Sequence, residues 1–243
     1  MLCSLTASLS LFLLKEPSRT ADKLGLLLHR IINIYARAGF KVRTILMDNK
    51  FKKVHNYVQH ATLNTTTVVE HVDNIECRIR VTKERCRGIF CTLPYISLLW
   101  IMLVHLLHHV VLWLNNFPVD NGVSSWFSPC EIILCHKLDA KRHCQAPFGA
   151  YCKIHEENDP TSSMKSHGIP AICLGPTGNL QGMYSLLNLA TSLVTKWCCF
   201  TELPTPDLVA HVGCRCWQFW GNNVLLADLS ATCRQTDITC HLF

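Results

Sequence analysis

The chain has 243 residues, of which 49% are hydrophobic, so it can bury the core of one large domain or two small ones. Its formal net charge of +6 tolerates a polyanionic partner but does not require one. The 15 cysteines are scattered without a paired C-x-x-C. This argues against a disulfide framework and favours reduced, mostly buried thiols in an intracellular protein.

Two apolar stretches raise the question of a membrane segment. Residues 5–14 lack the positively charged n-region of a signal peptide, so they match one only weakly. Residues 96–114 carry no Asp, Glu, Lys or Arg over 19 residues, about the length that spans a bilayer. However, His105, His108 and His109 lie mid-segment, where lipid penalises them. We therefore expect a buried helix, with a membrane anchor through 96–114 as the alternative.

Strand and helix patterns alternate in the first part of the chain. Apolar residues recur at helical spacing up to Gly39, a residue typical of a helix end. Alternating and β-branched residues then indicate strands. The predicted elements are a helix over 21–38, a strand over 41–47 that runs into Asp48, a short helix over 51–60, and a strand over 62–69.

A strongly basic amphipathic helix is predicted over residues 70–88, ending at Gly88. Its predicted buried stripe consists of Val72, Ile75, Ile79, Thr82 and Cys86, and its basic residues are Arg78, Arg80, Lys83, Arg85 and Arg87. Glu76, Arg80, Lys83 and Arg87 share a neighbouring face. On periodicity alone, this face is a solvated surface stabilised by i,i+4 pairs such as Glu76–Arg80.

The second half changes character. After the long apolar helix, residues 115–129 form a turn-rich linker, and residues 148–204 predict short strands in a small β-barrel or hairpin module. GPTGNLQG (175–182) lacks the ending of a phosphate loop and is interpreted as a turn. The expected division is 1–117, 118–147 for a linker with a short helix, 148–204, and an irregular tail over 205–243.

Two groups of potential zinc ligands have spacings that do not fit a familiar zinc finger. They are His136, His143, Cys144, Cys152 and His155, and the cysteines 198, 199, 214 and 216. We expect ordinary packed or surface residues at these positions.

Several stretches, in this order, resemble the integrase region of copia-type LTR retrotransposon polyproteins. They are residues 19–48, the helix over 70–88, residues 110–132, and FGAYCKIHEE (148–157) with AICLGPTGNLQG (171–182). The resemblance implies an α/β fold, with a partial ribonuclease-H-like core followed by long helices and the small β-barrel or hairpin module. It also implies an ancestral role in DNA integration and a nuclear location if that role is retained.

The chemistry of that family is phosphoryl transfer by two Mg²⁺ ions held by three carboxylates. By resemblance, Asp48 corresponds to the second carboxylate. Glu76 corresponds to the third by its flanking residues, and Glu84 is the alternative because its spacing from Asp48 fits better. The resemblance also assigns non-sequence-specific contact with DNA phosphates to the basic helix, through Arg78, Arg80, Lys83 and Arg87.

The first carboxylate of the family pattern is not found. Only Glu16 and Asp22 precede Asp48, and neither lies on a hydrophobic strand. We therefore expect a truncated remnant with weak DNA binding and no catalysis unless a second copy or another chain completes it. The alternatives are a membrane-associated protein and a non-catalytic α/β interaction protein.

Overall fold

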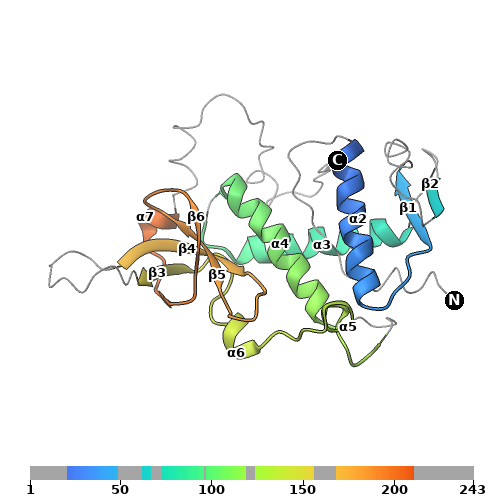
Figure 1. Cartoon of the computed structure of the whole chain (residues 1–243). Coiled ribbons are helices and arrows are strands. Elements are labelled where there is room, and N and C mark those ends of the chain that lie inside the picture. The colour runs from blue at the N-terminus through green and yellow to red at the C-terminus, as the bar shows by residue number, and fades with distance from the viewer. Residues whose placement is uncertain are drawn as a thin grey trace. The chain divides into compact units, whose positions relative to one another are not determined.

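The computed structural model describes residues 21–48, 62–66, 73–95, 97–118, 124–155 and 168–210. They divide into two compact units. Figure 1 labels their helices and strands. The first unit takes the described residues up to Arg87 together with Leu107–Asp139, and the second takes Gly88–Leu106 and the described residues from Ala140 onward. The architecture mixes helices and sheets, in agreement with the α/β class expected from the sequence.

The first unit begins with helix α2 (Ala21–Arg37) and the parallel pair β1 (Thr44–Asp48) and β2 (Thr62–Thr66). Gly39 ends α2 in a left-handed conformation, with φ of 81°, and the Phe40 N–H donates to the Tyr35 carbonyl at 2.9 Å. This six-to-one bond is the Schellman closure that a glycine permits. The predicted helix is confirmed, and the two predicted strands are confirmed over 44–48 and 62–66. The predicted helix over 51–60 and residues 67–69 of the second predicted strand lie outside the described residues.

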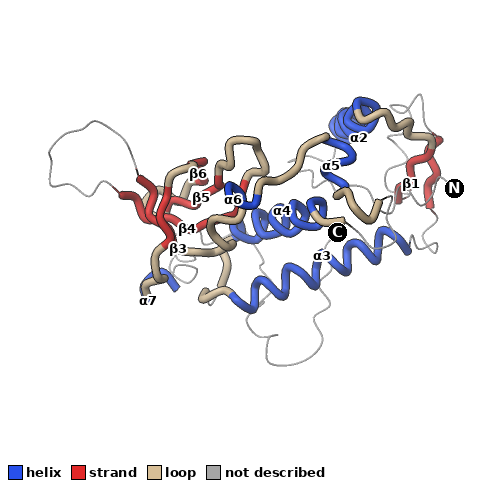
Figure 2. The backbone as a smooth tube through the Cα atoms, turned by 90° about the horizontal axis from the view of Figure 1, so that it is seen from below, coloured by secondary structure: helices blue, strands red, loops and turns tan. Residues whose placement is uncertain are grey.

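Two long helices follow, α3 (Asp73–Thr92) and α4 (Trp100–Asn116), drawn as separate coils in Figure 2. The prediction that the first of them ends at Gly88 is wrong. A glycine inside a helix costs only about 1 kcal/mol, and the half-buried Ile89 and Phe90 extend the packed surface beyond it.

The apolar helix α4 is confirmed as partly buried. Met102, Leu106 and Val110 recur every fourth residue and are almost fully covered. No helix within the described ranges is long and apolar enough to cross a membrane. The first unit also contains α5 (Pro129–Leu134), which packs against α2 and starts with a capping box between Ser128 and Glu131.

The second unit is built on a five-stranded antiparallel sheet. The strands are β3 (Tyr151–His155), β4 (Gly168–Pro176), β5 (Tyr184–Asn188), β6 (Val194–Trp197) and β7 (Phe200–Glu202), in the order β6-β5-β4-β3-β7. Short helices α6 (Ala140–His143) and α7 (Asp207–Ala210) flank it in the sequence. The β-rich character predicted for 148–204 is confirmed.

The connection between β6 and β7 determines the shape of this sheet. These strands are its two edges, yet only Cys198 and Cys199 separate them in the chain. Four strand spacings of about 4.8 Å would place the edges of a flat sheet roughly 19 Å apart. Three Cα steps from Trp197 to Phe200 reach at most about 11 Å. The sheet is therefore curled, although β6 and β7 are not paired with each other in the described structure.

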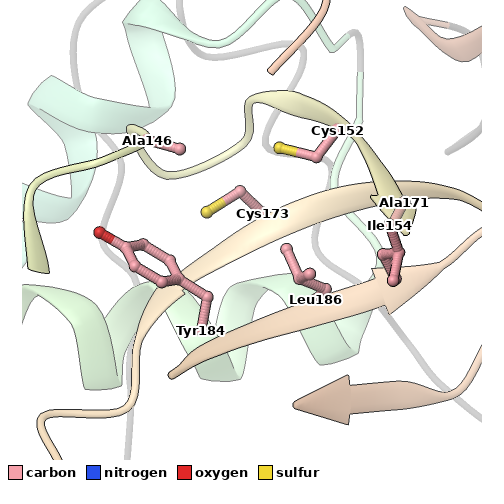
Figure 3. Close-up of a cluster of buried hydrophobic side chains, with 7 residues drawn as sticks. All are labelled: Ala146, Cys152, Ile154, Ala171, Cys173, Tyr184 and Leu186. Atoms are coloured by element: carbon pink, nitrogen blue, oxygen red, sulfur yellow. The ribbon is translucent and has the colours of Figure 1, made fainter. Parts of the chain in front are cut away.

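The inside of the curled sheet is filled by alternate residues of its three central strands. These are Cys152 and Ile154 from β3, Ala171 and Cys173 from β4, and Tyr184 and Leu186 from β5, with Ala146 beside them (Figure 3). Phe200 of β7 packs edge-on against Tyr184 of β5, with ring centroids 5.0 Å apart. Since β7 and β5 are three positions apart in the sheet, this contact requires the curl.

Helix α4 contains a histidine whose burial predicts a dependence of stability on pH. Nε2 of His109 accepts a hydrogen bond from the Trp113 indole at 3.1 Å, and burial lowers the pKa of His109 to about 4. An unfolded histidine titrates near 6.5, so the unfolded state binds more protons between pH 6.5 and 4. We expect the free energy of unfolding to fall as the pH drops through this window, by on the order of 2 kcal/mol.

Urea denaturation at pH 7 and pH 4.5 measures this loss. In His109→Phe, the loss between the two pH values should be clearly smaller than in the parent. The matched control is His29→Phe, which replaces an exposed histidine of α2. An equal loss in the parent and in His109→Phe would show that His109 does not carry the effect.

Candidate nucleic-acid interface

Helix α3 has one side that packs against protein. Thr82 is 8% exposed and its hydroxyl donates to the Arg78 carbonyl at 2.8 Å. Cys86, one turn further on, is half-buried, and burial raises the pKa of its thiol to about 11. These two members of the predicted stripe are confirmed, whereas Ile79, on the same face as Cys86, is 47% exposed. The buried side of α3 is therefore centred on Thr82 and Cys86.

Three basic residues lie away from this buried side. A helix turns by about 100° per residue, so Arg80, Lys83 and Arg87 lie within a sector of about 60° around the helix axis. The centre of this sector lies well over 90° from Thr82. Arg80 and Arg87 are exposed, and Lys83 is half-buried. Their spacing of three, four and seven residues makes them neighbours on one surface. We call Arg80, Lys83 and Arg87 the basic face of α3.

The rotation of about 100° per residue places Arg78 on a different face from Arg80, Lys83 and Arg87, with which it was predicted to bind DNA. Arg78 and Arg85 are seven residues apart, so they share a face, and Arg78 lies about 160° around the helix from Arg80. Arg78 is half-buried and Arg85 is exposed. One continuous helix therefore cannot present all four predicted DNA contacts to a single straight ligand.

Arg80 and Arg87 of the basic face are available for an external anion. In the part of the chain that the structure describes, Arg80 and Arg87 make no ion pair, so the predicted Glu76–Arg80 pair is not formed. Glu76 and Glu84 are exposed and lie about 80° apart around the helix. Glu76 and Glu84 reduce the positive potential of the basic face but do not form ion pairs with Arg80 or Arg87.

The predicted carboxylate pair is only partly placed. Asp48 is the last residue of β1, opposite Thr66 at the carboxyl ends of two parallel strands, but its side chain lies outside the described atoms. Glu76 lies near the start of α3, and Glu84 lies two turns later. Carboxylates suit Mg²⁺, but the distance of the Asp48 carboxylate from Glu76 and Glu84 is not among the described features. The pairing of Asp48 with Glu76 or Glu84 stays a prediction.

The His/Cys group of residues 136–155 has structural roles where its contacts are seen. His143 is buried, and its Nε2–H donates to the Asn179 carbonyl at 2.7 Å. Cys152 belongs to the core of the curled sheet. No three His, Cys, Asp or Glu side chains in the described ranges lie close enough together to hold a metal ion.

Residues 177–182 form the turn predicted for 175–182, whereas Gly175 and Pro176 end β4. The Thr177 N–H donates to the Met183 carbonyl at 2.8 Å, and the Met183 N–H donates to the Asn179 side chain at 2.9 Å. Arg142 of α6 also donates to the Leu180 carbonyl at 2.9 Å. These bonds use the polar groups of the segment to connect β4, β5 and α6.

Sequence reasoning missed the way Cys198 and Cys199 converge. Their sulfur atoms lie 3.7 Å apart. Adjacent residues of a strand normally point to opposite faces, so spacing alone gives no reason to expect the contact. The only local signal is that the two cysteines separate two very short strands.

No model of a known protein family matches this chain, and no curated protein matches it either.

Proposed function

We propose that this chain is a non-catalytic protein derived from a copia-type integrase, and that it binds nucleic acid through the basic face of α3. The observation that carries the proposal is the exposure of Arg80 and Arg87 on the side of α3 away from the buried Thr82. The resemblance of the surrounding sequence to an integrase core adds the class of partner, which is DNA. The finer assignment of the first unit to a ribonuclease-H-like core belongs to the same proposal.

The physical basis of binding is charge. Guanidinium groups donate paired hydrogen bonds to phosphate oxygens, and each phosphate that is neutralised releases condensed counterions. Three cations on one helix face therefore give a salt-dependent affinity with little preference for sequence, with a slope of log K against log salt near −2.7 for duplex DNA. So few contacts make the binding weak, and a net charge of +6 favours the encounter.

Catalysis would need more than these residues supply. In a two-metal site, Mg²⁺ ions are held by three carboxylates and stabilise the attacking and the leaving oxygens. The sequence provides candidates for two of them, Asp48 and either Glu76 or Glu84. We therefore propose that Mg²⁺ binds weakly or not at all in this chain, and that a second copy or another chain would have to complete any active site.

Reversing the charge of the exposed arginines tests the basic face. We expect Arg80→Glu/Arg87→Glu to weaken binding of a duplex DNA fragment and to reduce the magnitude of the salt slope by about 2, because two phosphate contacts are lost. Fluorescence anisotropy at several salt concentrations measures both quantities. If the chain is instead an α/β interaction protein and this face is only solvated, neither the affinity for DNA nor the salt slope should change.

The matched control is Arg78→Glu/Arg85→Glu, which changes the net charge equally on the other face of the same helix. It should reduce the salt slope by less than half as much. Circular dichroism of both double variants checks that α3 is retained. Equal effects of the two pairs would mean that overall charge, rather than the basic face, governs binding.

A second expectation concerns turnover. The chain should neither cleave nor join an end-labelled duplex with Mg²⁺ or Mn²⁺, because positioning and charge stabilisation by the full ligand set supply most of the catalysis in phosphoryl transfer. Asp48→Asn serves as the control for contaminating nucleases. Product that forms with the parent chain and disappears with Asp48→Asn would contradict the non-catalytic assignment.

A further inference from the structure

The two residues that join β6 to β7 are held in place from both sides. Trp197 and Phe200 flank them, and both side chains pack against the buried core of the sheet. The His155 N–H also donates to the carbonyl of Cys199 at 3.5 Å, next to the β3–β7 pairing. Cys198 and Cys199 therefore lie on a short connection between the two edge strands of the curled sheet, and the residues at both ends of this connection pack against the core.

The thiols of this connection converge on the surface. Cys198 and Cys199 are both exposed, neither is in a disulfide, and their Sγ atoms are 3.7 Å apart. A tetrahedral Zn²⁺ ion with Zn–S bonds of about 2.3 Å holds two sulfur ligands roughly 3.8 Å apart. The separation between the two sulfurs therefore matches one edge of a zinc tetrahedron without rearrangement of the connection.

We propose that Cys198 and Cys199 form a bidentate thiolate site for Zn²⁺. On binding, both thiols release their protons to solvent and the metal ion replaces the S–H···S contact, with no change in oxidation state. Two thiolates neutralise the charge of the ion. No third His, Cys, Asp or Glu side chain among the described residues adjoins the pair. Water completes the coordination.

Other cysteines of the chain show what distinguishes this pair. Cys152 and Cys173 lie in the core, and burial raises the pKa of each thiol to about 12, which disfavours the thiolate that a metal needs. Cys135 and Cys144 are exposed, but they lie in separate units, at the end of α5 and after α6. They are therefore suitable control positions that have the same chemistry without the pairing.

Titration of the reduced full-length chain with Co²⁺, a spectroscopic substitute for zinc, tests the site. We expect thiolate-to-cobalt absorption that zinc abolishes, and we expect it to be largely lost in Cys198→Ser, in Cys199→Ser and in the double variant. Cys135→Ser/Cys144→Ser should retain it. Absorption that persists undiminished in Cys198→Ser/Cys199→Ser, or that falls equally in the control, would overturn the proposal.

A measurement on the parent chain does not depend on how the variants fold. Zinc should slow the alkylation of Cys198 and Cys199 by iodoacetamide, as followed by mass spectrometry, and should leave Cys144 unaffected. Alkylation of both cysteines at the same rate with and without zinc would contradict the site. Because this readout involves neither DNA nor α3, it is independent of the proposed nucleic-acid binding.

Discussion

The shortness of the connection between β6 and β7 is the constraint on which the second unit depends. Two residues join the two edges of a five-stranded sheet, so the sheet has to curl. The curl brings Phe200 onto Tyr184 and encloses the side chains of the three central strands. It also leaves Cys198 and Cys199 on the outside with their sulfurs together. One topological feature thus produces both the core and the proposed metal site.

In the first unit, the helical period of α3 determines which side chains are buried and which are exposed. One rotation of about 100° per residue places Thr82 and Cys86 toward protein and directs Arg80 and Arg87 away from it. Burial of the first pair holds the helix, so the cations are presented on a fixed scaffold rather than on a loop. The same rotation assigns Arg78 to a different surface, which narrows the proposed interface to three residues.

Local patterns predicted the parts of the fold that local physics determines. The end of α2 at Gly39 follows from the left-handed conformation that glycine adopts easily, and the strands of the second unit follow from β-branched and turn residues. Continuation of α3 through Gly88 was not predictable from that residue alone, because packing of Ile89 and Phe90 outweighs the small helix penalty. The exposure of Ile79 and the convergence of Cys198 with Cys199 depend on contacts between distant segments, which spacing in the sequence does not reveal.

Arginine footprinting with phenylglyoxal, with and without duplex DNA at low salt, tests the role of α3 most directly. Mass spectrometry reports the extent of modification at each arginine separately, so the two faces of the helix are compared within one molecule. If the basic face binds phosphate, DNA protects Arg80 and Arg87 while the exposed Arg85 stays as reactive as before. Protection of Arg85 equal to that of Arg80 and Arg87, or no protection of any of the three, would contradict binding through this face.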